Sequence, residues 1–218
     1  MAFKGIPAEA FEFFERLEAD NTKSFWEANK ATYADAVRGP MEALAAEVDA
    51  DFGPLRLFRP YRDVRFSKDK TPYKTACGAV GEDEGGCVYY VQVSSAGLGV
   101  ATGMYHMAPD QLARFRDAVG GAGGAELEPI VATLRTAGYD IGADSLKTAP
   151  RGWPRDHPRI DLLRLKGLTA WRQHSAVRWL HTAAAKKRIE QVWRDAAPMN
   201  GWLSAHVGPS ELPPDDLR

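Results

Sequence analysis

The sequence predicts an α+β fold in which an antiparallel sheet of about four to six strands has helices packed around it. Apolar residues recur with a helical period over about the first 50 residues and again after residue 108, whereas residues 88–93 alternate with a period of two. This order of helices, hairpins and helices differs from the regular alternation of a parallel sheet. We expect one domain over residues 1–207 and a flexible tail at residues 208–218.

Three helices are expected in the first quarter of the chain. The first has Pro7 at its first position, where proline is favoured. The second begins after the capping residue Thr22 and is expected to be interrupted by Gly39-Pro40. The third then covers residues 41–48.

The sheet is expected in the middle of the chain, with strands at residues 75–80, 87–94 and 98–107. The alternation in the second of these predicts that helices cover one face of the sheet. Before it, residues 61–75 should form an ordered loop with a short helical turn. After it, we expect helices at about 110–119, 127–137, 160–165 and 176–196, a flexible glycine-rich break at 120–124, a loop at 150–158 and a strand at 168–174.

The composition restricts the classes of protein that the chain can represent. No apolar run approaches the roughly 20 residues of a membrane helix, and no signal peptide opens the chain, so we expect a cytoplasmic protein without membrane contact. Two cysteines, Cys77 and Cys87, are too few for a disulfide scaffold, and the sequence leaves their pairing open. The five histidines lack metal-ligand spacing, so no metal is expected. No other cofactor is expected either.

The formal net charge of −1 conceals two basic segments, since residues 56–75 sum to +5 and residues 151–194 to +8. The first segment has four arginines at a spacing of three. Its charged residues are Arg56, Arg59, Arg62, Arg65, Lys68, Lys70 and Lys74, with the acids Asp63 and Asp69. Because guanidinium groups bind carboxylate and phosphate through paired hydrogen bonds, this segment predicts an anion site.

The pattern Arg59-x-x-Arg62-Asp63-x-Arg65-Phe66-x-x-Asp69-Lys70-x-x-Tyr73 resembles the hallmark of a family catalogued as domain of unknown function 2461, found mainly in bacteria and some fungi. The resemblance covers most of residues 3–205 and includes Glu27, Asn29, Lys30 and Tyr33. It implies no established activity. Members of the family tend to have histidine after the Tyr-Lys-Thr step, where this chain has Ala76 and Cys77.

The expected ligand is a small phosphorylated or carboxylated molecule, bound by a protein that is either an enzyme or a binding protein. The candidate binding residues are Arg59, Arg62, Asp63, Arg65, Lys68, Lys70, Tyr73, Lys74, Arg151 and Trp153. Arg59, Arg62 and Arg65 would clamp the anion, and Asp63 with Tyr73 could transfer a proton. However, neighbouring arginines favour the ionised form of Asp63, which weighs against its use as a general base near neutrality. Arg151 and Trp153 lie in a proline-stiffened loop suited to the far wall of a site.

Two other functions are compatible with the same residues. The basic segments could form a groove for single-stranded nucleic acid with Tyr61, Phe66, Tyr73 and Trp153 as stacking surfaces. The sequence pI near 6.5 makes this the less favoured alternative. In the other alternative, the acids of the motif bridge its arginines in a structural ion-pair network, and the protein acts by binding another protein. The oligomeric state is left open.

Overall fold

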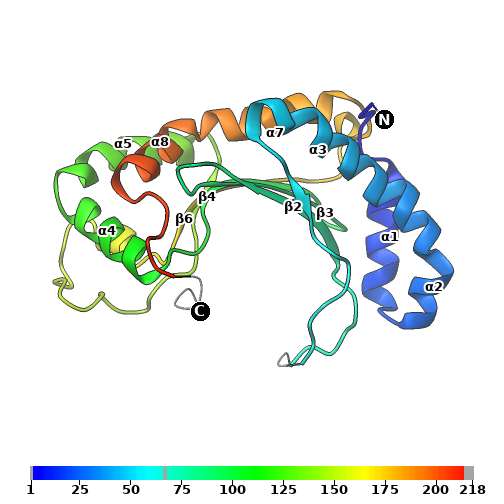
Figure 1. Cartoon of the computed structure of the whole chain (residues 1–218), viewed down its shortest axis with the longest axis horizontal. Helices are drawn as coiled ribbons and strands as arrows, with labels where there is room; N and C mark the ends of the chain where they lie inside the picture. The colour runs from blue at the N-terminus through cyan, green and yellow to red at the C-terminus, as the bar shows by residue number, and fades with distance from the viewer. Residues whose placement is uncertain (1, 66–67, 214–218) are drawn as a thin grey trace. The chain divides into compact units, whose positions relative to one another are not determined.

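The computed structural model describes residues 2–65 and 68–213 and has an α+β fold, which confirms the predicted class (Figure 1). The strands form a six-stranded antiparallel sheet with the order β1-β2-β3-β4-β6-β5. The elements are α1 (Ala8–Ala19), α2 (Lys23–Thr32), η1 (Tyr33–Arg38), α3 (Gly39–Phe52), β1 (Arg56–Leu57), β2 (Ala76–Glu82), β3 (Val88–Ser94), β4 (Gly97–Met104), α4 (Pro109–Gly120), α5 (Ala122–Thr136), β5 (Asp140–Gly142), α6 (Ile160–Leu163), β6 (Leu168–His174), η2 (Arg178–His181), α7 (Ala184–Asp195) and α8 (Ala197–His206).

The chain divides into two compact units, which are described separately. Unit 1 comprises residues 1–81, 90–100 and 173–191. Unit 2 comprises residues 82–89, 101–172 and 192–218. The expectation of a single domain over residues 1–207 stays a prediction. Among the described helices, none combines the length and apolar character that crossing a bilayer needs.

In unit 1, residues 23–52 are helical throughout, so the predicted interruption at Gly39-Pro40 is wrong. The predicted cap is present, since Thr22 Oγ1 accepts a hydrogen bond from the backbone N–H of Phe25 at 3.2 Å. The helix passes the proline through the π-helical segment η1, in which the N–H of Gly39 donates to Ala34 O. A π turn is wider than an α turn, and this relieves the clash between a proline ring and the carbonyl four residues earlier.

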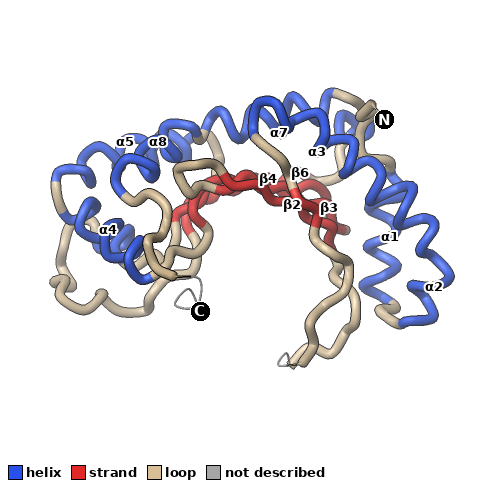
Figure 2. Tube along the Cα trace, in the orientation of Figure 1, coloured by secondary structure: helices blue, strands red, loops and turns tan. Residues whose placement is uncertain are grey.

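One face of the unit 1 strands is covered by helices, as the alternation predicts. Val91 and Val93 of β3 have 0% exposure, whereas Tyr90 and Gln92 are half-buried. Figures 1 and 2 show α3 and α7 running along one side of β2 and β3. An ion pair between Glu47 and Lys186, with 3.3 Å between carboxylate and ammonium, joins these two helices. The half-buried side chains of β3 therefore lie on the opposite, open face.

Unit 2 packs helices around two tryptophans whose indole N–H groups are satisfied. Trp202 of α8 donates to Gly123 O at 2.9 Å, and Trp193 of α7 donates to Ala101 O at 3.0 Å. The predicted flexible break at residues 120–124 is wrong, because α5 already begins at Ala122 and its first glycines are buried against neighbouring segments. Tertiary packing here outweighs the low helix propensity of glycine.

The C-terminal helical region also differs from its prediction. The single helix expected at residues 176–196 is replaced by the 3₁₀ turn η2 and by α7, and a further helix, α8, follows. Val177, near the start of the expected helix, is 37% exposed. The following residues are held by α4, since Arg114 donates to Val207 O at 2.6 Å and Asp110 accepts from Glu211 N–H at 2.9 Å. Residues 214–218 lie outside the described residues.

Candidate functional site

The arginine motif lies on an arm of unit 1, which we define as residues 58–75 between β1 and β2. Figure 2 shows it as a loop leaving the end of the sheet. The two halves of the arm pair as an antiparallel ribbon, with hydrogen bonds from Arg62 N–H to Pro72 O at 2.9 Å and from Lys74 N–H to Pro60 O at 2.8 Å. The described part of the arm has no helical turn. Phe66 and Ser67 lie outside the described residues.

The ribbon geometry separates the arginines that the sequence places in one clamp. Tyr61 and Tyr73 form the non-hydrogen-bonded pair of the ribbon, so their side chains share one face. Successive side chains alternate between faces, which puts Arg59 on the Tyr61 face and Arg62 on the other. Arginines that are three residues apart on an extended chain therefore point to opposite faces and cannot contact one anion together.

The Tyr61 face of the arm is fixed to the helices of unit 1. Tyr73 is 4% exposed and stacks on Trp26 of α2, with ring centroids 4.4 Å apart and planes at 9°. Asn21 accepts from Tyr73 N–H at 3.1 Å and donates to Tyr73 O at 3.0 Å. Burial, with smaller contributions from Tyr61 and Glu27, raises the pKa of Tyr73. The predicted proton-transfer and stacking residue is thus an anchor of the arm.

Both acids of the arm are occupied within it. Asp63 accepts from the guanidinium of Arg65, at 2.7 Å to Nη2 and 3.0 Å to Nε, and this contact is the main reason that the pKa of Asp63 is lowered. Asp69 accepts from Thr71 N–H at 2.9 Å and pairs with Arg62, and the pKa of Asp69 is lowered chiefly by that backbone bond. Two of the three proposed clamp arginines therefore already face a carboxylate.

The open face of unit 1 carries a second group of cations around an aromatic ring. Arg56 and Lys74 lie 5.8 Å and 4.9 Å from the centroid of the Phe58 ring. The Phe58 ring lies 6.3 Å from that of Tyr90, whose hydroxyl donates to Gln92 Oε1 at 2.8 Å. We call these five residues, Arg56, Phe58, Lys74, Tyr90 and Gln92, the Phe58 cluster.

A glycine makes room for the Phe58 cluster. A Cβ at Gly78 would lie 2.7 Å from the Tyr90 hydroxyl and 3.2 Å from the Phe58 ring, so a larger residue would displace one of them. Only Lys74 of this cluster belongs to the predicted binding residues. The signal that could have found the others is the half-buried side of the alternating strand, combined with the aromatic at position 58.

The remaining predicted residues of the arm are exposed and separate. Arg59 and Lys68 have no acidic hydrogen-bonding partner among residues 2–65 and 68–213. Lys70 Nζ donates to Val64 O at 2.9 Å, which ties the two halves of the arm together near the tip.

Arg151 and Trp153 belong to unit 2. Arg151 is exposed, whereas Trp153 is half-buried and packs on Gly120 at the end of α4, where a Cβ would overlap the indole ring. The indole also meets His157 edge to face, with ring centroids 5.5 Å apart. Trp153 thus anchors its loop, in agreement with the high average burial of tryptophan.

The cysteines are free and buried, and no group of residues suited to a metal ion occurs in the described part of the chain. Burial, with Asp83 and Glu82 nearby, raises the pKa of Cys87 to about 12. Burial also raises the pKa of Cys77, which is hydrogen-bonded to Tyr33. Neither thiol is suited to act as a nucleophile at neutral pH.

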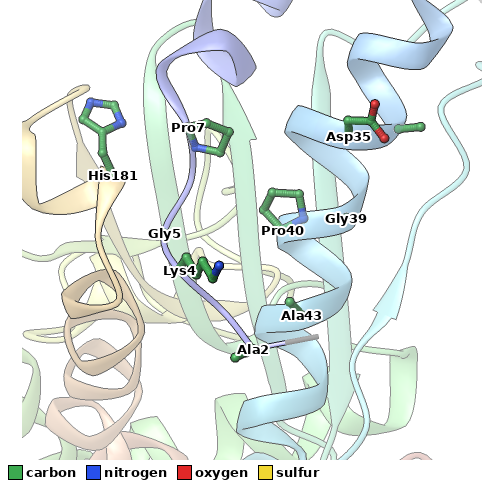
Figure 3. A pocket seen from close by; sticks show the side chains of 10 residues that line it. Ala2, Lys4, Gly5, Pro7, Asp35, Gly39, Pro40, Ala43 and His181 are labelled. Atoms are coloured by element: carbon green, nitrogen blue, oxygen red, sulfur yellow. The ribbon is translucent and has the colours of Figure 1, made fainter.

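Sequence reasoning missed a pocket of about 460 Å³ in unit 1 (Figure 3). It lies between the N-terminal segment, the turn η2 and the helical rod of η1 and α3, and none of the predicted binding residues lines it. Its lining residues are Ala2, Lys4, Gly5, Pro7, Ala34, Asp35, Gly39, Pro40, Ala43 and His181.

Comparison with known proteins identifies a family and nothing more specific. No curated protein and no solved structure matches the chain significantly. A family model described as conserved hypothetical protein (DUF2461) matches residues 9–202, which is most of the chain. The chain therefore belongs to the DUF2461 family of conserved hypothetical proteins.

Proposed function

We propose that unit 1 binds a small anionic molecule, bearing phosphate or carboxylate, at the Phe58 cluster. The observation that carries this proposal is that Arg56 and Lys74 adjoin the same aromatic ring while neither has an acidic partner in the described ranges. By contrast, Arg62 and Arg65 of the motif are already neutralised by acids of the arm. An anion that meets Arg56 and Lys74 does not have to displace a carboxylate.

The surroundings of the two cations favour anion binding over a freely solvated charge. Lys74 is half-buried, and apolar contact with Phe58 limits the water around its ammonium group. An anion then gains charge-assisted hydrogen bonds from a planar guanidinium on Arg56 and from the ammonium of Lys74. The amide group of Gln92 is oriented by the Tyr90 hydroxyl and adds a neutral donor.

The proposal concerns binding, without a catalytic step. Asp63 and Asp69 are held ionised because hydrogen bonds lower the pKa of each carboxyl. A general base that operates near neutrality needs the opposite shift. The tyrosine of the motif, Tyr73, is buried against Trp26.

Calorimetric titration with phosphate, sulfate, succinate and citrate tests the proposal. Lys74→Met and Arg56→Met keep the apolar stems and remove the charges, and each should weaken binding by about tenfold or more, as expected for the loss of a charge-assisted hydrogen bond. Arg59→Met is the matched control, because it removes the same charge on the opposite face of the arm. Equal losses in all three variants would show that binding follows the total positive charge of the arm and not the Phe58 cluster, and no binding of any anion would refute the function itself.

One observation favours a surface for single-stranded nucleic acid as a second candidate. Tyr61 is 51% exposed and rests on the Trp26–Tyr73 stack, with its ring centroid 6.0 Å from Trp26. An exposed aromatic beside cations can stack a base. Of the other surfaces predicted for stacking, Tyr73 is covered and Trp153 packs on Gly120 of α4, while Phe66 lies outside the described residues. Oligonucleotide binding that falls steeply with salt and is lost in Tyr61→Ala would favour this candidate.

A further inference from the structure

The pocket of unit 1 is large enough to hold a small molecule. Its volume of about 460 Å³ lies within the usual range for such sites. Most of its lining residues are alanine, glycine or proline, which leave space and add no charge. Lys4, Asp35 and His181 are its polar side chains. They offer one cation, one anion and one imidazole, and these groups determine what the pocket can recognise.

The wall formed by the N-terminal segment is held in place by buried contacts. Ile6 N–H donates to Leu180 O at 2.7 Å, and Phe3 N–H donates to the Glu47 carboxylate at 2.7 Å. Gly5 has φ of +110°, and a Cβ there would collide with the backbone at His181 and Thr182. The segment is thus packed closely against η2, and it holds Lys4 at the edge of the pocket. Figure 3 shows the Lys4 side chain extending toward the helix that carries Pro40.

The imidazole of His181 is also oriented. Its Nδ1 lies 2.8 Å from Ile6 O, and because a carbonyl oxygen only accepts, Nδ1 must carry the proton of this hydrogen bond. In the neutral ring the other nitrogen is then an acceptor. Phe11 packs edge to face with this ring, with centroids 5.9 Å apart.

The helical wall contains a backbone carbonyl without a helical donor. In η1 the N–H of Gly39 donates to Ala34 O, so it is not directed to Asp35 O, its α-helical partner. The next residue in the π register is Pro40, which has no N–H. The carbonyl of Asp35 is therefore left without a helical donor, on the same turn that presents the Asp35 carboxylate to the pocket.

We propose that this pocket binds a small molecule that carries both an ammonium and a carboxylate group, as a free α-amino acid does. The ammonium group lies at Asp35, whose carboxylate and carbonyl oxygens both accept its N–H bonds. The carboxylate group lies at Lys4, and His181 supplies an acceptor for a polar side chain of the ligand. The small wall residues leave the volume that this ligand needs. This proposal is independent of the anion site on the arm, because no residue is shared.

The test is a thermal-shift and calorimetric comparison of the full chain with amino acids and with analogues that have one charge. Serine, alanine and γ-aminobutyrate represent ligands with both groups, ethylamine lacks the carboxylate, and propionate lacks the amine. We expect at least one doubly charged ligand to raise Tm and to bind about tenfold or more tightly than either analogue. Absence of binding by all three, or equal binding of ethylamine or propionate, would overturn the proposal.

Substitutions of lining residues test whether the ligand binds in this pocket. Asp35→Asn and Lys4→Met each remove one charge from an exposed side chain, and Ala34→Leu fills the pocket from an exposed position. Each should lower affinity about tenfold or more, as loss of a charged hydrogen-bond partner or of the volume does. Glu9→Gln, at an exposed position of α1, is the control that should keep wild-type affinity. Binding that survives all three pocket variants would refute the site, and far-UV circular dichroism confirms that each variant is folded.

Discussion

The ring of Tyr73 lies parallel to the indole of Trp26, with centroids 4.4 Å apart and planes at 9°. This stack joins the arginine-rich arm to α2 and adjoins the rings of Tyr33 and Tyr61. Two parts of the family motif that are far apart in the sequence therefore meet in one aromatic cluster. The stack makes the base of the arm part of the folded core of unit 1, while Arg59, Arg65, Lys68 and Lys70 of the arm stay exposed.

Trp26→Ala should destabilise the protein by about 3–5 kcal/mol, because it removes a buried indole and leaves a cavity. Tyr61→Ala is the matched comparison, since Tyr61 belongs to the same cluster but is 51% exposed, and it should cost about 1 kcal/mol or less. Urea denaturation gives both free energies of unfolding. Equal losses for the two variants would show that the stack does not stabilise the fold.

Asn21→Ala should destabilise the protein by about 1–3 kcal/mol, because it leaves the N–H and C=O of Tyr73 without their side-chain partner. Asn21→Asp keeps an acceptor for the N–H and loses only the donor, so it should cost less than the alanine variant. Hydrogen exchange at the Tyr73 amide provides a local readout. The exchange should be faster in Asn21→Ala, and an unchanged rate would show that the amide is protected by something else.

Gly5→Ala should be much more destabilising than Gly152→Ala, although both glycines have positive φ, at +110° and +87°. A Cβ at Gly5 would meet the backbone of η2, whereas nothing lies within 4 Å of a Cβ at Gly152. The second variant therefore carries only the backbone strain, about 1–2 kcal/mol, and the first adds the steric clash. Thermal unfolding of the two variants measures the difference. A smaller loss for Gly5→Ala would mean that the N-terminal segment is not pinned as described.

Asp110→Asn should alter stability at neutral pH but not in strong acid. The pKa of Asp110 is lowered from 3.8 to about 2, first by the hydrogen bond from Glu211 N–H and then by Ser210 and Arg114. A carboxyl whose folded pKa is depressed contributes stability above its unfolded pKa, and that contribution is lost as pH falls through the folded value. The free energy of unfolding of the wild type should therefore exceed that of the variant at pH 5–7, and the difference should shrink between about pH 4 and pH 2. A difference that persists below pH 2 would contradict this assignment.

Local patterns were sufficient for much of the fold. The alternation around Tyr90 predicted both an antiparallel strand and its covered face, because every second side chain of a strand points the same way. The cap at Thr22 and the loop at residues 150–158 were also correct, since capping and proline content act over a few residues. The segments at Gly39-Pro40 and 120–124 were predicted wrongly, because tertiary packing stabilises a helical conformation there although the local sequence has a low helix propensity.

For the candidate sites too, some features could be predicted from the sequence and others depended on the tertiary structure. The sequence by itself determined that residues 56–75 carry an excess of positive charge in a family motif, since charge and residue type are visible without folding. Only the tertiary structure decided which face of the arm each cation occupies, that Asp63 and Asp69 neutralise Arg65 and Arg62, and that Lys74 lies beside Phe58. Those features depend on the register of the ribbon and on contacts between residues distant in the chain. The pocket could not be predicted from the sequence for the same reason, because its walls come from three segments that are separate in the chain.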